Sequence, residues 1–196
     1  HHEIDENAKI KASIKIVPYK TSATEKIVKK DFIEINRIWS QANIKFDLIN
    51  INFTKAETKN FKKYSELSFK NYDNEKHIDS SLKYHLEIVD HKKHNNDNGI
   101  NVYYVPKMLS GICGAWANEV NIMLIGLSEK KFFDPNVKLY WKCNRMKTLA
   151  HEFGHTVELD HSEIVNNLMV SSGDGTDLTK VQINQSREFL KKVLGL

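Results

Sequence analysis

The sequence predicts a single α/β (α+β) domain, and three observations lead to this class. A chain of 196 residues with 40% apolar residues is long enough to bury one sizeable core. Near the N-terminus an alternating segment, a helical segment and a second alternating segment follow one another, which is typical of two parallel strands joined by a helix. Short apolar runs and two further helical segments follow, without an internal repeat or a linker that would separate two domains.

The first expected element is a half-buried strand over residues 8–17, where apolar and polar residues alternate. A capping-box pattern over Ser22–Glu25 then begins a helix that we expect to run to about Ala42. Its apolar residues recur near helical spacing: Ile27, Phe32, Ile35, Ile38, Trp39 and Ala42. Alternation over 44–53 predicts the second strand.

Residues 54–98 are rich in Lys, Asn, Ser and Tyr, and we interpret them as an insertion with one helix over 79–89. Three histidines in this insertion would also suit a metal ion: His85, His91 and His94. Because residues 90–98 are typical of a polar loop, the favoured interpretation is that these histidines are solvated.

A short apolar run over Ile100–Val105 predicts a buried central strand. We expect a short extended segment over Ser110–Asn118 and a further strand over Glu119–Ile125. A loop containing Asp134-Pro135 then leads to Cys143, where a helix begins that runs to about Val157.

A second capping-box pattern, Thr179–Gln182, begins the final helix, which Gly195 ends. Its expected apolar members are Val181, Phe189, Leu190 and Val193.

Charge and hydropathy exclude two classes of protein. The formal net charge is +4, and the lysines are scattered instead of being clustered in one stripe, so we do not expect a nucleic-acid partner. No apolar run approaches the roughly 20 residues that a membrane helix needs. We expect a monomer.

The two cysteines, Cys113 and Cys143, do not indicate a disulfide-rich scaffold. They pair in an oxidising compartment or remain free thiols, and only geometry separates these alternatives. His1-His2 is typical of the remnant of a purification tag, in which case a native leader has been removed.

The most informative stretch is the run from His151 to His155 (HEFGH), followed by His161. Positions four apart lie one turn apart on the same face of a helix, so His151 and His155 can hold one metal ion. Three neutral imidazoles suit zinc and leave a fourth position open, which is typical of a catalytic site. The alternative is that the three histidines, on a helix and the turn after it, have only hydrogen-bonding partners and bind no metal. Glu152 flanks the same position and is the candidate general base and acid.

The segment from His151 to His161 resembles the extended zinc motif of the metzincin metallopeptidases. That family has a methionine in a tight turn beneath the metal, and Met169 is the candidate here. The resemblance implies a twisted, mixed five-stranded sheet with an antiparallel edge strand, a backing helix, an active-site helix and a C-terminal helix. It also implies one catalytic domain, 1–196, with an upper subdomain (1–157) and a lower subdomain (158–196).

In this family the edge strand pairs antiparallel with an extended substrate. The resemblance therefore suggests Gly114, Ala115 and Trp116 as the substrate rim, although core packing is an equal alternative for Trp116. The pocket for the substrate side chain after the cut would be walled by the residues that follow Met169, beginning with Val170 and Ser171.

Two positions depart from or refine the resemblance. Glu158 stands where the family has a glycine at the sharp exit from the helix, so we expect a strained turn or a slightly different path. Ser171 stands where the astacin-like branch has a tyrosine ligand, so the nearer resemblance is to the matrixin and adamalysin-like branches.

We therefore expect a zinc-dependent endopeptidase that uses water activated by zinc, acts on a peptide or protein substrate and, by resemblance, is secreted. A bridge between Cys113 and Cys143 would then tie the rim to the start of the active-site helix. The alternative is a zinc-bound peptide-binding or narrow-target, toxin-like protein with little general proteolytic activity.

Overall fold

The structure is a computed structural model of the chain, and it describes residues 8–16, 22–53, 99–105, 108, 113–117, 122–127, 131–134, 139–171 and 175–194. The insertion expected over 54–98 lies outside the described residues, together with its helix and its three histidines.

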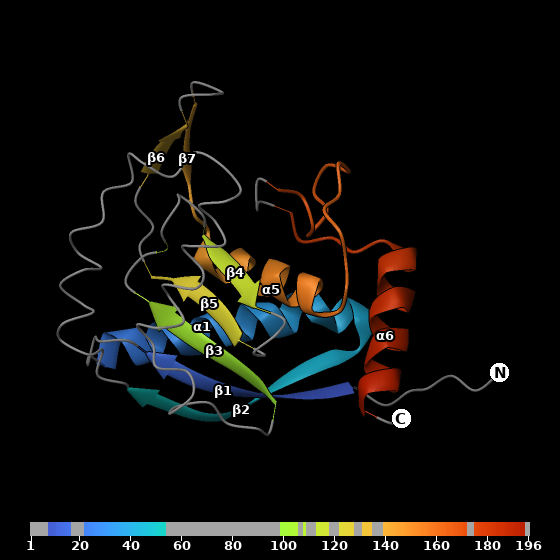
Figure 1. The fold of residues 1–196 in the computed structure, drawn as a ribbon, viewed down its shortest axis with the longest axis horizontal. Helices are drawn as coiled ribbons and strands as arrows, with labels where there is room; N and C mark the ends of the chain where they lie inside the picture. Colours follow the sequence, from blue (N-terminus) through green and yellow to red (C-terminus); the bar gives the residue numbers. More distant parts are fainter. Residues whose placement is uncertain are drawn as a thin grey trace.

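One sheet organises the described residues, with the strand order β2-β1-β3-β5-β4 (Figure 1). Its strands are β1 (Ala8–Ile16), β2 (Ile44–Phe53), β3 (Ile100–Val105), β4 (Gly114–Ala117) and β5 (Ile122–Gly126). The pairs β1–β2, β1–β3 and β3–β5 are parallel, whereas β4 is antiparallel to β5. Among the described residues, β4 therefore forms one edge of the sheet and β2 the other.

The connection between the parallel strands β1 and β2 is helical, as the sequence predicts. Helix α1 spans Ser22–Trp39, and a 3-10 turn, η1, continues it over Ser40–Ala42. Asn43 follows in the left-handed region, with φ 52°. Asparagine tolerates this conformation, so it ends the helical path and sends the chain into β2.

Alternating side chains of the sheet divide between two hydrophobic clusters. The larger cluster includes Val102, Tyr104, Met123 and Ile125 with residues of α1 and α5, the helix over Arg145–Thr156. The smaller cluster contains the residues of opposite parity: Tyr103, Val105, Ile122 and Leu124, with Met108 and Ala117. Because β3 is buried on both faces, its whole sequence is close to an unbroken apolar run.

Helices α1 and α5 lie side by side on one face of the sheet (Figure 1). Phe153 of α5 packs edge-on against Trp39 of α1 and Phe46 of β2, with ring centroids 4.7 and 4.5 Å apart. The Trp39 indole Nε1 also donates to the Ala150 carbonyl at 3.1 Å. These contacts fix the rotation of α5 about its axis, which decides where its other face points.

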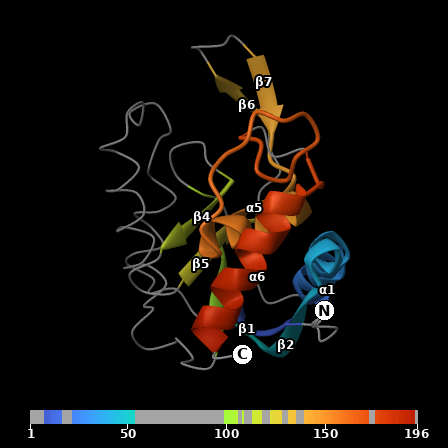
Figure 2. The ribbon, with the colours of Figure 1, turned by 90° about the vertical axis from the view of Figure 1, so that its right-hand side faces the viewer.

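The expected loop before Cys143 contains a hairpin instead. Strands β6 (Lys131–Asp134) and β7 (Leu139–Lys142) form an antiparallel pair that projects from the main sheet in both views (Figures 1 and 2). The loop prediction is wrong here because it gave weight to Asp134-Pro135. The flanking aromatic residues favour strands, and the proline falls between them.

Helix α6 spans Lys180–Leu194 and stands at one end of the molecule, in front of α5 in Figure 2. Its predicted capping box is confirmed, because Thr179 and Gln182 exchange hydrogen bonds between side chain and backbone. Two of its predicted apolar contacts are wrong: Val181 and Val193 are 73% and 62% exposed. Only a narrow face of α6, including Leu190 and Ser186, is buried, since the helix packs at the end of the core.

The predicted mixed α/β class is confirmed by this arrangement of helices and strands. None of the helices in the described part of the chain is both long and apolar enough to cross a membrane.

Candidate metal centre

Helix α5 carries the first part of the site. It begins at Arg145, two residues later than expected, with Asn144 as its N-cap. His151 and His155 are four residues apart and share one face, while Phe153 on the opposite face is fully buried in the core. The packing of Phe153 therefore turns both imidazoles away from the core cluster and toward the segment that follows the helix.

The turn after α5 brings the third histidine back to this face. Glu158 adopts the left-handed region with φ 65°, and its N–H donates to the His155 carbonyl at 3.0 Å. The N–H of Leu159 donates to the Gly154 carbonyl at 2.9 Å, which closes the helix end. The expected turn is thus made with a glutamate in the conformation that glycine adopts freely.

The three imidazoles converge. One ring nitrogen from each of His151, His155 and His161 lies within 4.8 Å of the others, and the Nε2 atoms of His155 and His161 are 3.2 Å apart. Tetrahedral zinc with Zn–N bonds of about 2.0–2.1 Å holds its ligand nitrogens about 3.3 Å apart. The donor set and the separation of the His155 and His161 nitrogens therefore fit zinc.

Backbone carbonyls orient two of these rings. His151 Nδ1 lies 2.8 Å from the Leu168 carbonyl oxygen, and His155 Nδ1 lies 2.9 Å from that of Leu159. A carbonyl only accepts, so Nδ1 carries the proton and the Nε2 lone pair remains for a metal. Burial lowers the pKa of His151 to about 4 and also lowers the pKa of His155, so both rings are neutral near pH 7.

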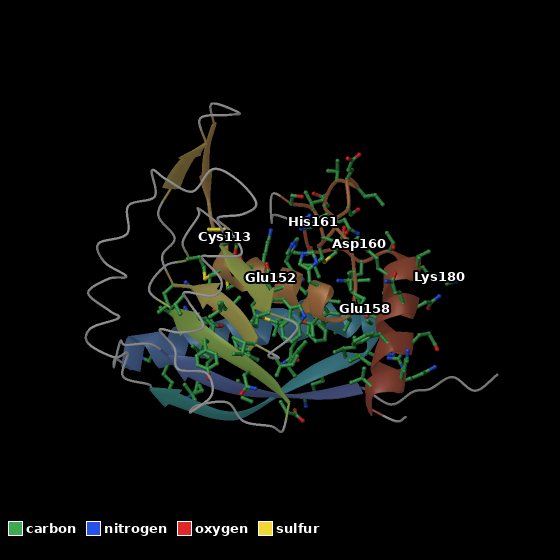
Figure 3. All side chains as sticks on the ribbon, in the orientation of Figure 1. Cys113, Glu152, Glu158, Asp160, His161 and Lys180 are labelled. Atoms are coloured by element: carbon green, nitrogen blue, oxygen red, sulfur yellow. A yellow bond between two sulfur atoms is a disulfide. The ribbon has the colours of Figure 1, made fainter. Side chains whose placement is uncertain are left out.

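Glu152 is buried on the side of α5 that faces β4, and Figure 3 shows it across from His161. Burial raises the pKa of its carboxyl group to about 8 in the protein without metal. A Cβ on Gly114 would lie 3.2 Å from Glu152 Cγ and 2.8 Å from Thr148 Cγ2. The glycine in β4 therefore allows the edge strand to lie directly against the helix turn that carries Glu152.

Met169 packs against α5 and is fully buried. A Cβ on Gly154 would overlap the Met169 sulfur, so the two residues are in close contact. Val170 and Ser171 follow as a half-buried and an exposed residue, and the remainder of the expected pocket wall, 172–174, lies outside the described residues.

The candidate rim residues Gly114, Ala115 and Trp116 lie on β4, an edge strand among the described residues. Trp116 is partly buried and packs against the larger core cluster, as its alternative interpretation expects. The open question about the cysteines is resolved, because Cys113 and Cys143 form a disulfide. This bond joins the residue before β4 to the start of α5 (Figure 3).

A buried ion pair between α1 and α5 was not predicted. Arg145 Nε donates to Asp31 Oδ2 at 2.8 Å, and the Tyr104 hydroxyl donates to the same oxygen at 2.9 Å. Burial and the Asp31 carboxylate raise the pKa of Tyr104 well above its usual range. The sequence did carry one sign of this ion pair: Asp31 is an acidic residue on the apolar face of α1, between Val28 and Ile35.

A second unpredicted group is the buried amide of Asn167, which pairs with Gln182 of α6. The capping-box pattern singles out Gln182 in the sequence, but nothing there singles out Asn167. The two partners are 15 residues apart on different elements, so no local pattern pairs them.

Comparisons with known proteins identify the fold. No protein-family profile and no curated protein matches the sequence. Among solved structures, archaemetzincin from Methanopyrus kandleri is 14% identical, with a TM-score of 0.57 over 93% of this chain and 96% of that chain. A chain from a chaperone–substrate complex is 13% identical, with a TM-score of 0.56 over 96% of this chain and 35% of that chain.

Metalloproteinase-II from Bacteroides fragilis is 12% identical, with a TM-score of 0.47 over 95% of this chain and 55% of that chain. This chain therefore spans about a third of the chain from the chaperone–substrate complex and about half of the Bacteroides chain. At these identities, the likeness to archaemetzincin shows a shared fold.

Proposed function

We propose that the protein is a zinc-dependent endopeptidase of the metzincin type, closest to the matrixin and adamalysin-like branches. The observation that carries the proposal is the convergence of three imidazoles beside a buried glutamate, next to β4, which is an edge strand within the described part of the chain. The fold shared with archaemetzincin and the resemblance of the motif support the same proposal.

His151, His155 and His161 would hold the zinc ion through Nε2. When bound, zinc supplies a Lewis acid that polarises a carbonyl group and makes water more acidic. The protein's contribution is preorganisation, because backbone carbonyl oxygens already orient the rings of His151 and His155.

Glu152 would act as general base and then as general acid. Its carboxylate takes a proton from the attacking water and delivers it to the leaving amine of the cleaved peptide bond. The side chain of Glu152 is buried, and the absence of a Cβ at Gly114 leaves room for its stem beside β4.

An extended peptide or protein substrate would add to the edge of β4 that has no strand partner among the described residues, so that Gly114, Ala115 and Trp116 form its rim. Val170 and Ser171 would begin the wall of the pocket for the residue after the cut. Met169 would support the ligand set from below, through its contact with Gly154 on the ligand-bearing helix.

We further propose one catalytic domain, in which residues 1–157 and 158–196 form the two sides of the cleft, acting as a monomer. Secretion into an oxidising compartment is supported by the disulfide between Cys113 and Cys143, because such bonds persist mainly in oxidising environments.

A protein that grips peptides without cutting them is the alternative. It would be favoured if Glu158 held His161 away from the other two histidines. The 3.2 Å separation of the His155 and His161 Nε2 atoms favours the peptidase instead.

The test is cleavage of a diverse peptide mixture, read by mass spectrometry. Native protein is compared with Glu152→Gln, and with Glu188→Gln as a control that changes an exposed carboxylate on α6. We expect cuts by the native protein and the control, and a loss of at least about 100-fold in Glu152→Gln. Equal cutting by all three proteins would refute the role of Glu152, and zinc binding without cutting would favour the binding protein.

A further inference from the structure

The orientation of the His151 ring depends on one peptide unit in residues 167–170, which are called the Met169 segment below. His151 Nδ1 donates to the Leu168 carbonyl oxygen at 2.8 Å. The same peptide plane also contains the N–H of Met169, which points in the opposite direction. Any rotation of this plane therefore moves the acceptor that holds the His151 ring.

The other end of this plane is held by a side chain. The Met169 N–H donates to Asn167 Oδ1 at 2.9 Å, in an Asx-type turn that encloses Leu168. The Asn167 side chain is only 1% exposed, so solvent does not replace this contact. One amide oxygen thus fixes the peptide whose carbonyl orients a metal ligand.

The amide of Asn167 is in turn held by α6. Asn167 Nδ2 donates to Gln182 Oε1 at 2.8 Å, and Gln182 Nε2 donates back to Asn167 Oδ1 at 3.1 Å. Gln182 Oε1 also accepts from the Thr179 N–H at 2.9 Å, so the same side chain caps α6. The reciprocal pair leaves the Asn167 amide one orientation, with its oxygen toward Met169.

We propose that Asn167 and Gln182 are positioning residues of the metal centre, which set the Leu168–Met169 peptide plane and, through it, the ring of His151. The inference rests on the proposed zinc site and assigns part of the zinc affinity to the N-terminus of α6. The Leu168 carbonyl is a direct partner of a ligand, a kind of group that contributes about 10–100-fold to metal affinity, and Asn167 and Gln182 act on it through the peptide plane.

The test compares three variants of the full chain. Gln182→Met removes every hydrogen bond of the side chain. Gln182→Glu keeps an acceptor for Thr179 and Asn167 but loses the donor to Asn167 Oδ1, so it retains the helix cap. Asn184→Ala is the matched control, because Asn184 is an exposed residue of the same helix.

Zinc affinity is measured by competition with a chelator, thermal stability is measured without metal, and the visible spectrum is recorded with Co²⁺ as a probe. We expect both Gln182 variants to bind zinc at least about tenfold more weakly and to show an altered Co²⁺ spectrum. Only Gln182→Met loses metal-free stability through its cap. Asn184→Ala matches the native protein in zinc affinity and Co²⁺ spectrum and is at least as stable, because alanine favours a helix more than asparagine does.

Native zinc affinity and an unchanged Co²⁺ spectrum in folded Gln182→Glu would overturn the inference while leaving the proposed zinc site intact. A native chain that takes up no zinc would contradict the proposed function itself, and this inference with it. The two failures are therefore distinguishable.

Discussion

Glu158 combines an exposed, charged side chain with a left-handed backbone at the exit of α5. Among the described non-glycine residues, only Asn43 and Asn166 share a positive φ, and asparagine tolerates it. For glutamate the conformation costs about 1 kcal/mol. Its carbonyl accepts from Gln185 Nε2 at 2.9 Å, so α6 supports the turn from outside.

Glu158→Gly should therefore raise the free energy of unfolding by about 0.5–1 kcal/mol, because glycine adopts this φ without strain. Urea denaturation of the metal-free protein measures the effect. Asp160→Gly is the control: Asp160 is also exposed, but its φ is not positive, so glycine there gains nothing. If Glu158→Gly lowered the free energy of unfolding, the Glu158 side chain would stabilise the protein by more than the strain of its positive φ costs.

The buried carboxyl group of Glu152 should make the stability of the metal-free protein depend on pH. In the metal-free protein its pKa is raised from 4.5 to about 8, so between these values the folded chain keeps a proton that the unfolded chain has lost. Glu152 therefore favours folding less and less as pH rises through this window. Relative to Glu152→Gln, native stability should fall by an amount on the order of a few kcal/mol from pH 5 to pH 8.

Urea denaturation of both proteins in EDTA measures this difference. The lowered pKa of His151 affects both proteins and cancels in the comparison. Glu188→Gln, which alters an exposed carboxylate, should run parallel to the native protein. A constant gap between native protein and Glu152→Gln across this pH range would contradict the burial of Glu152 as a desolvated acid.

At the scale of elements, α5 and the Met169 segment touch at a position without a side chain. A Cβ on Gly154 would overlap the sulfur of Met169, which is fully buried and has little room to move. Outside such contacts, alanine is better than glycine in a helix by about 1 kcal/mol. The effect of Gly154→Ala on stability should therefore change sign when the side chain of Met169 is removed.

Gly154→Ala should destabilise the native protein, whereas in a Met169→Ala background it should stabilise the protein by up to about 1 kcal/mol. A double-mutant cycle in urea measures the coupling. Additive effects of the two substitutions would show that the residues do not compete for the same space.

The disulfide joins the edge strand β4 to the start of α5, across 30 residues of sequence. Closing a loop of this length restricts the unfolded chain, which predicts a loss of about 3–4 kcal/mol when the bond is absent. Cys113→Ser/Cys143→Ser should show this loss in urea, and the native protein should show it after reduction. Equal stability of oxidised and reduced protein would mean that the bond does not restrain the chain.

At the scale of the whole molecule, the predictable parts are those that local periodicity determines. The strand bounds expected at 44–53 and Ile100–Val105 match β2 and β3, because alternation and burial on both faces leave direct traces in sequence. The approach of His151 and His155 was equally readable, since a helix brings positions four apart together, whereas that of His161 was expected from the resemblance of the motif.

The unpredicted parts depend on contacts between distant residues. The bond from Arg145 to Asp31 spans 114 positions, and no local pattern pairs them. Asn167 and Gln182 meet only because the chain folds the Met169 segment onto the N-terminus of α6. The hairpin of β6 and β7 was missed for a different reason, because a proline was given more weight than the aromatic residues around it.

The central claim, that one zinc ion held by three histidines cuts peptides with the help of Glu152, is tested most directly by a single titration. Zinc is added to metal-free protein while bound metal and cleavage of one peptide are followed together. We expect native cleavage to rise until one zinc per chain is bound, and Glu152→Gln to bind the same amount without cutting. Cleavage that does not depend on zinc, or equally tight zinc binding after His161→Ala, would contradict the account.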